Sequence, residues 1–167
     1  MLHSLRLRTR LVWVLLQAVS TVALAQIIEK SKYQVIEVKQ FEFGQGTNMP
    51  KSFQRALMQE TALALLQIGK FKEVLREGEK PADPGLPLLQ LTTKVTEFQG
   101  GSDWGFFRAK TRIAAHIKFI DAATGRVLVE DDLKAEVELA GLRARESIDV
   151  TRSIAKEIAK VTKQRFF

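Results

Sequence analysis

Alternating apolar and polar positions mark extended segments along the chain. A period of two is typical of strands that bury one face, and Ile36 and Val38, set between Glu37 and Lys39, illustrate it. The segments with this pattern are residues 33–43, 88–98, 110–119 and 127–139. The pattern therefore predicts a sheet of about four strands.

Two further segments carry apolar residues at helical spacing. The first should begin near Pro50, whose missing N–H costs nothing at the first helical position, and end at Gly69, a typical C-terminal stop. The second should begin at about Glu146. Their apolar stripes are Phe53, Leu57, Ala64, Leu65 and Ile68 in the first, and Val150, Ile154, Ile158 and Val161 in the second. Each stripe needs a packing partner, and a sheet face is the obvious one.

The order of these elements, strand, helix, three strands and helix, predicts an α+β two-layer sandwich with both helices on one face of a mixed sheet. Residues 71–74 are consistent with a short extended piece before the loop 76–87. Asp121–Gly125 offers a tight reversal between the last two strands. Asp131 falls on the apolar side of the last strand, which suggests a bulge there.

The N-terminal residues have the order of a secretory signal peptide. Arginines 6, 8 and 10 precede the apolar run Leu11–Leu16, and the small-residue stretch ends in Ala23-Leu24-Ala25. A membrane anchor is the alternative, but polar residues interrupt the segment before it reaches the roughly 20 apolar residues that a span needs. We expect residues 1–25 to be removed, which leaves residues 26–167 as one exported domain.

Composition then narrows the class of protein. The 167-residue chain has no cysteine, which excludes disulfides, thiolate metal sites and cysteine nucleophiles. Removing residues 1–25 would lower the net charge from +7 to +4. So modest an excess argues against a nucleic-acid partner, because nucleic-acid sites concentrate their positive charge.

Little in the sequence points to catalysis. His116 is the only histidine after residue 25, and its position in a strand predicts an exposed polar residue. The acidic run 130–132 cannot converge on one cation, because adjacent strand residues point to opposite faces. No nucleophile elbow or phosphate-binding loop is present. We therefore predict no catalytic residue, no metal site and no cofactor.

The segment 100–108 is the strongest candidate for a binding surface, because it sets large aromatic side chains among three glycines. Loops of this kind bind partners or membrane interfaces. The candidate binding residues are Trp104, Phe106, Phe107, Arg108, Lys110 and Arg112. Two interpretations stay open, an exposed interface and a lid in which Trp104 and Phe107 fold back over the core.

The C-terminal residues 163–167 combine cations with two terminal aromatic residues. They are consistent with contact to anionic lipid, docking on a partner, or closure of the core. Cations at this place also complement the dipole of a helix C-terminus.

Three stretches together resemble a family of bacterial envelope proteins. They are residues 33–41, 69–74 and 119–127, with the sequences YQVIEVKQF, GKFKEV and FIDAATGRV. In that order they resemble the family of domain of unknown function 4410, which is similar to the periplasmic domain of the curli secretion channel and to the N-terminal domain of TolB. The resemblance implies an exported domain of this α+β fold, without agreed catalytic residues. Members often carry an anchoring cysteine that this chain lacks, which favours a periplasmic form without a lipid anchor.

Two functions follow as hypotheses. The first is a non-enzymatic periplasmic adaptor that binds another envelope protein, whose identity the sequence does not give. The second is a module that binds anionic lipid or glycan through Arg108, Lys110, Arg112 and Lys118, beside the aromatic loop. A hydrolase would need a pair of converging carboxylates that the sequence does not place together.

Overall fold

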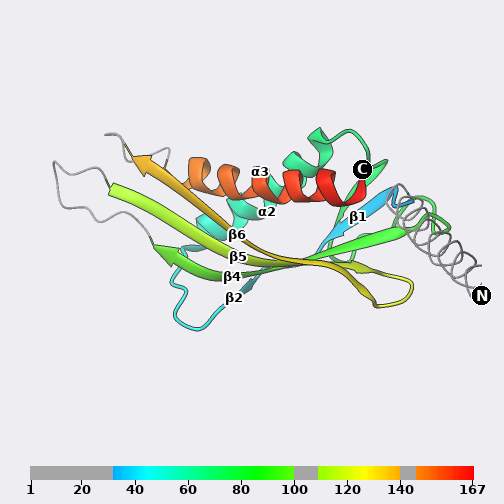
Figure 1. The fold of residues 1–167 in the computed structure, drawn as a ribbon, viewed down its shortest axis with the longest axis horizontal. Helices are drawn as coiled ribbons and strands as arrows, with labels where there is room; N and C mark the ends of the chain where they lie inside the picture. The colour runs from blue at the N-terminus through cyan, green and yellow to red at the C-terminus, as the bar shows by residue number, and fades with distance from the viewer. Residues whose placement is uncertain (1–31, 100–108, 140–145) are drawn as a thin grey trace, which may run out of the picture.

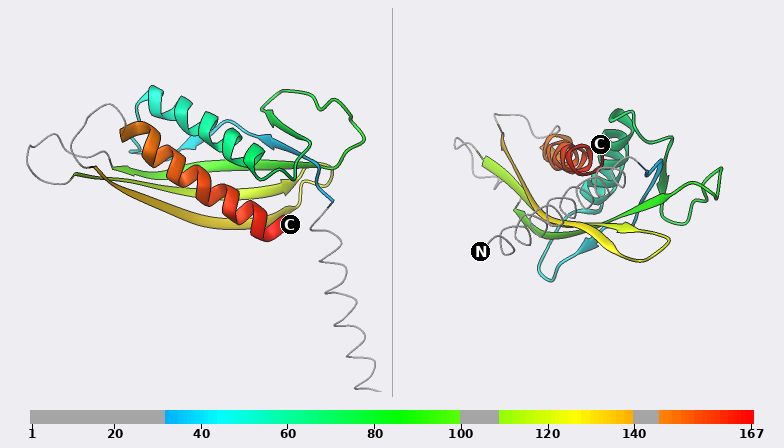
Figure 2. Two further views of the ribbon diagram at one scale, coloured as in Figure 1. Left: turned by 90° about the horizontal axis from the view of Figure 1, so that it is seen from above. Right: turned by 45° about the vertical axis from the view of Figure 1, so that its right-hand side comes forward.

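The computed structural model describes residues 32–99, 109–139 and 146–167, which form two layers (Figures 1 and 2). One layer is a six-stranded sheet. The other consists of α2 (Lys51–Gln67) and α3 (Glu146–Phe166), which lie side by side on one face of that sheet. The predicted α+β class is confirmed, and the sheet has six strands where about four were expected. No helix of the described residues is long and apolar enough to cross a membrane.

The sheet combines parallel and antiparallel strands in the order β3-β1-β4-β5-β6, with β2 paired to β4. Its strands are β1 (Val35–Val38), β2 (Glu42–Phe43), β3 (Glu73–Arg76), β4 (Leu88–Gln99), β5 (Ala109–Asp121) and β6 (Val127–Leu139). β1 runs parallel to β3 and β4, whereas β4, β5 and β6 form an antiparallel meander. The extended piece expected at residues 71–74 is β3, two residues further along the chain.

The predicted first strand is interrupted, and its two parts differ in phase. Ile36 and Val38 are buried in the core, and so is Phe41, with Phe43 packed against it. A regular strand would turn residue 40 to the core instead, so the chain gains one residue between Val38 and Phe41. Both parts stay attached to β4, because the N–H groups of residues 39 and 44 donate to β4 carbonyls over 2.9 Å. The interruption thus brings both phenylalanine rings to the helix side of the sheet.

The bulge in β6 does not lie at Asp131. That residue pairs in register with Ile117, whereas the register shifts where Phe119 faces Val129 and the next pair is Ile120 with Val127. Leu128 is therefore the extra residue, next to the Asp121 turn. Asp131 keeps its place on the helix side, half-buried at an edge strand where water still reaches it.

The helices bury the stripes that the sequence predicts. The side chains of Leu57 and Leu65 in α2, and of Ile154 and Ile158 in α3, are at most 1% exposed. Pro50 is the N-cap residue of α2 and not its first helical residue, because its ψ of 145° is not helical. Gly69 ends that helix with a positive φ of 67°, as expected.

Candidate ligand-binding groove

The predicted binding residues fall largely outside the described part of the chain. Trp104, Phe106, Phe107 and Arg108 all lie in the segment 100–108, which the structure does not describe. The choice between interface and lid therefore stays a prediction. Lys110 and Arg112, the other two members of the set, belong to β5 and pair in register with Glu138 and Glu136 of β6.

On the outer face of the sheet, away from the helices, the cations of β5 meet the acids of β6. Arg112 donates from Nε to Glu136 Oε2 over 2.6 Å, and Lys118 Nζ lies 3.1 Å from Glu130 Oε1. Both pairs are exposed, so each contributes little to stability. Their main effect is to neutralise two of the cations that the sequence offered for an anionic ligand.

His116 lies among these pairs and has both ring nitrogens engaged. Nδ1 is 2.8 Å from Asp132 Oδ1, and Nε2 is 2.8 Å from Glu130 Oε1. The hydrogen bond to Asp132, followed by the one to Glu130, raises the pKa of His116 above its usual 6.5. Neither this cluster nor any other group of three or more such side chains is arranged to hold a metal ion among the residues that the structure describes. An imidazole held by two carboxylates has no free nitrogen to act as a general base.

The buried carboxylate of Glu37 is also engaged by partners within the fold. Glu37, 6% exposed, accepts hydrogen bonds from Lys39 Nζ, Gln90 Nε2 and the Gly78 N–H. Burial alone would raise the pKa of Glu37, but these hydrogen bonds lower it overall. The carboxylate thus attaches the loop after β3 to the sheet, which is a structural role.

The core is closed at one end by aromatic rings, and we call this region the aromatic end. Its members are Tyr33, Phe71, Phe119, Phe166 and Phe167. Phe166 is only 3% exposed, and its ring meets those of Tyr33 and Phe119 edge to face, with centroids 5.9 and 5.1 Å apart. Of the roles considered for the C-terminal segment, Phe166 therefore closes the core.

Asp121 fixes the polar side of the aromatic end. Its Oδ2 accepts hydrogen bonds from Tyr33 Oη over 2.6 Å and Lys32 Nζ over 3.2 Å, while Oδ1 accepts from the N–H groups of residues 123 and 124. The Tyr33 hydrogen bond, more than the others, lowers the pKa of Asp121 to about 2. Burial and the same hydrogen bond raise the pKa of Tyr33 to about 12. Both groups therefore keep one protonation state between these values.

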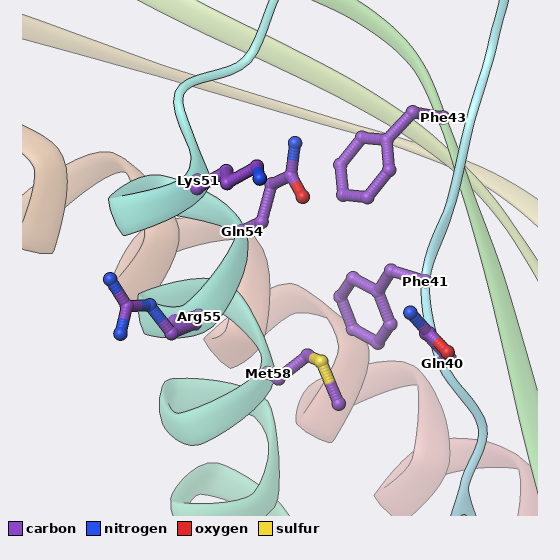
Figure 3. Close-up of a pocket in the computed structure, with 7 residues that line it drawn as sticks. All are labelled: Gln40, Phe41, Phe43, Lys51, Gln54, Arg55 and Met58. Carbon is purple, nitrogen blue, oxygen red and sulfur yellow. The ribbon is translucent and has the colours of Figure 1, made fainter.

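β1 and β2 follow one another along the same side of β4, and together we call them the β1–β2 line. A groove opens at the end of this line that lies opposite the aromatic end, between the line and the first half of α2 (Figure 3). It consists of two adjoining hollows, of about 420 Å³ and about 200 Å³. The rings of Phe41 and Phe43 point from the strand toward α2, and Met58 reaches back toward Phe41. We call this the α2 groove; its lining residues are Val38, Gln40, Phe41, Phe43, Lys51, Gln54, Arg55, Met58, Gln59 and Arg76. It has an apolar floor and a polar rim.

The cations of the α2 groove differ from those of the outer face. Lys51, Arg55 and Arg76 are all exposed, and none forms an ion pair with a carboxylate of residues 32–99, 109–139 or 146–167. Positive charge over an apolar floor is suited to a ligand that carries both an acidic and an apolar group. The groove is thus a candidate binding site within the part of the chain that the structure describes.

Sequence reasoning did not identify this groove, although two signals for it exist. The apolar positions change from even to odd numbers between Val38 and Phe41. In addition, Lys51, Arg55 and Gln59 follow each other at four-residue spacing with no acid among them, so no neighbour on that helix face neutralises the cations. Both signals are weak without knowledge of which strand lies beside the helix.

Comparison with known proteins finds likeness in fold. No known family model matches the sequence, and no curated protein matches it. Protein XCC0632 of Xanthomonas campestris, of the DUF330 family, has a similar structure, with 10% sequence identity and a TM-score of 0.57 over 80% of this chain and 84% of that one. The PelC dodecamer of Paraburkholderia phytofirmans is similar as well, with 14% identity and a TM-score of 0.57 over 78% of this chain and 88% of that one. The hypothetical protein CT253 of Chlamydia trachomatis shares 10% identity, with a TM-score of 0.56 over 78% of this chain and 96% of that one.

At these identities the likeness shows a shared fold alone. One of the three proteins belongs to a family of unknown function, and none of their names states an enzymatic reaction. None of the three is named as a member of the family of domain of unknown function 4410, so that resemblance stays a prediction.

Proposed function

We propose that this chain is a non-enzymatic, exported module of the bacterial cell envelope that binds another envelope protein through the α2 groove. The groove carries the proposal, because it joins an apolar floor to exposed cations that the described residues leave without carboxylate partners. Export rests on the signal-peptide order of residues 1–25, which lie outside the described part. The module would serve in assembly, by holding a second protein in place.

The polar clusters support a binding role over a catalytic one. Acid–base catalysis needs a side chain whose accepting or donating atom is free to face a substrate. His116, Asp121 and Glu37 instead direct their polar atoms to partners within the chain. Each of these clusters has a structural explanation that needs no substrate.

Binding of anionic lipid or glycan through the basic and aromatic loop region is the alternative function. Arg112 and Lys118, two of its four cations, already lie in ion pairs, which reduces the charge that they offer to such a ligand. The parts of the alternative that rest on residues 104–108 stay a prediction. Co-sedimentation with anionic vesicles tests it, because a charge-driven contact must weaken as salt rises.

The cysteine-free chain makes a direct test of the adaptor role possible. A photocrosslinker attached to Gln59→Cys would sit at the rim of the groove, and one attached to Lys94→Cys would sit on the outer face of β4. In intact envelopes, we expect Gln59→Cys to give a covalent adduct with one defined envelope protein, identified by mass spectrometry. Lys94→Cys is the control and should give none. The absence of any protein adduct from either position would contradict the adaptor function.

A further inference from the structure

The α2 groove runs along an open edge of the sheet. β1 is paired on both sides, with β3 and with β4, but β3 ends at Arg76. Beyond that point β2 continues along β4, and no strand of the described residues pairs with its other side. An open edge of this kind can accept an extended segment from another chain.

The backbone of β2 turns a donor and an acceptor to this edge. The Gly44 N–H donates to the Val95 carbonyl of β4 over 2.9 Å, and successive residues of a strand point their N–H and C=O groups to opposite sides. The N–H and C=O of Phe43 therefore face away from β4, toward the open edge. Nearer β3, the Gln40 N–H is satisfied by Glu77 Oε2 over 3.1 Å. The pairing position beside Phe43 is the one that a further strand would use.

The two hollows lie along the same line. The smaller one adjoins Arg76 at the end of β3, and the larger one adjoins Phe41 and Phe43. Alternate side chains of a strand placed there would point to the helix side, against these two rings and Met58. The cations at the rim lie on this same side, because Lys51 and Arg55 belong to α2 and Arg76 pairs in register with a core-facing residue of β1. They would attract carboxylates at the helix-facing positions of such a strand.

We infer that the α2 groove binds an extended segment of a partner protein whose every second residue, on the side that faces α2, is either apolar or an aspartate or glutamate, and that this segment pairs with β2 as an additional strand beyond the end of β3. Backbone hydrogen bonds to the edge would supply the alignment, and the apolar floor and the cations would select the side chains. The inference rests on the proposed function and names its ligand.

Random nine-residue peptides displayed on phage provide the probe, selected on the purified exported form of the chain. We expect the enriched sequences to carry apolar residues and Asp or Glu together at every second position, the positions that face α2. Synthetic copies should bind more weakly as salt rises, and binding should slow amide hydrogen exchange at Phe43. Two sets of peptides should be compared, one N-methylated at its odd-numbered residues and one at its even-numbered residues. Only one set should lose binding, because the N–H groups of alternate residues face the edge of β2 and the others point away from it.

Matched charge reversals separate the groove from general electrostatics. Lys51→Glu with Arg55→Glu should weaken peptide binding at least about tenfold, because it removes both cations beside the larger hollow. Lys94→Glu with Lys134→Glu changes the net charge equally on the outer face and should alter binding less than about twofold. All four side chains are exposed, so both variants should fold.

Three results would overturn the inference: no enrichment of peptides with apolar and acidic residues together at every second position, binding unaffected by the groove reversal, or unchanged exchange at Phe43. Concentration-dependent self-association that the groove reversal abolishes would assign the groove to a second copy of the chain, and would also overturn it. If crosslinking from Gln59→Cys still captures a defined envelope protein after any of these results, the proposed function stands and only the strand-like ligand is wrong. If crosslinking fails as well, both fall.

Discussion

The aromatic end and the α2 groove lie at opposite ends of the β1–β2 line, and both are built around phenylalanine. At the aromatic end, the ring of Phe166 packs against Tyr33, which precedes β1, and against Phe119 of β5, and only 3% of the residue is exposed. At the groove, Phe41 is almost as well buried, with 4% exposed, but Phe43 is only half-buried, and about 420 Å³ beside the two rings stays open. The same residue type closes the core where other rings pack against it, and lines a groove where one side stays open.

The charged groups at the aromatic end and at the α2 groove also differ in whether they have partners within the fold. Asp121 at the aromatic end is held by hydrogen bonds from two side chains and two backbone N–H groups. Lys51 and Arg55 at the groove have no carboxylate partner within the described residues. A fold gains stability where polar groups are satisfied internally, whereas groups left for solvent are available to a ligand.

The largest effect should come from removing a ring at the aromatic end. Phe166→Ala would leave a cavity among Tyr33, Phe119 and the end of α3, and we expect it to lower the free energy of unfolding by about 3–5 kcal/mol. Phe43→Ala, beside an open hollow, should cost only about 1 kcal/mol, because the wild-type ring buries less apolar surface there. Denaturant unfolding of both variants measures the difference. Equal losses would mean that the two ends are packed alike.

Asp121→Asn should have the next largest effect, a loss of about 1–3 kcal/mol at neutral pH, because the hydrogen bonds from Tyr33 and Lys32 lose their charged acceptor. The pKa of Asp121 lies at about 2 in the folded chain and near 3.8 in the unfolded one, so its stabilising effect is present above about pH 4 and is lost as the pH falls toward 2. Thermal unfolding of wild type and variant between pH 6 and pH 2 checks this. The two melting curves should approach each other at the acid end; a constant separation would contradict the assignment.

Midway along α2, Thr61 offers a change of the opposite sign. It is fully buried, and its hydroxyl has no hydrogen-bond partner in the described part of the protein. Thr61→Val keeps the shape and removes an unsatisfied polar group, which should raise the free energy of unfolding by about 1 kcal/mol. Thr162 is the matched control, because its equally buried hydroxyl donates to the Ile158 carbonyl over 2.7 Å. Thr162→Val should give no gain, and a gain in both variants would assign the effect to valine itself.

The smallest effect concerns His116 on the outer face. Its pKa is raised by the hydrogen bonds to Asp132 and Glu130, so its stabilising effect is full below pH 6.5 and is lost as the pH rises through the folded pKa. An NMR titration of the ring should show Asp132→Asn lowering that pKa more than Glu130→Gln does, because the hydrogen bond to Asp132 is the larger cause. Stability at neutral pH should change little in either variant, as is usual for exposed pairs. An unchanged pKa in both variants would show that the ring stands free of the carboxylates.

Most of the fold follows from periodicity because its long elements each repeat their pattern several times. β4, β5, β6 and both helices lie where the sequence predicts them, within a few residues. β2 is harder to predict as a separate strand, since two residues cannot show an alternation, and the four residues of β3 give too short a pattern to fix its bounds. The bulge lies at Leu128 instead of the predicted Asp131. Asp131 needs no bulge, because a half-buried acid is tolerated on the helix side of an edge strand, where water still reaches it.

The candidate site was less accessible to sequence reasoning. The predicted binding residues 104–108 lie outside the described part, and Arg112 proved to have an acidic partner on the neighbouring strand, which only the register of β5 and β6 reveals. The α2 groove is formed by α2 and the edge of β2, and no local sequence pattern shows that these two elements lie side by side. Helical spacing correctly places Lys51 and Arg55 on the polar side of α2, but their lack of partners is a property of the assembled fold.

The extra residue between Val38 and Phe41 has a consequence for how such chains diverge. Loss of that one residue would place Phe41 and Phe43 in phase with Ile36 and Val38, so β1 and β2 could join as one regular strand with both rings still on the helix side. Homologues could therefore keep the apolar floor with either length of this short link. A comparison of related sequences should align the aromatic residues by the face of the sheet that they occupy, and not by the length of the link.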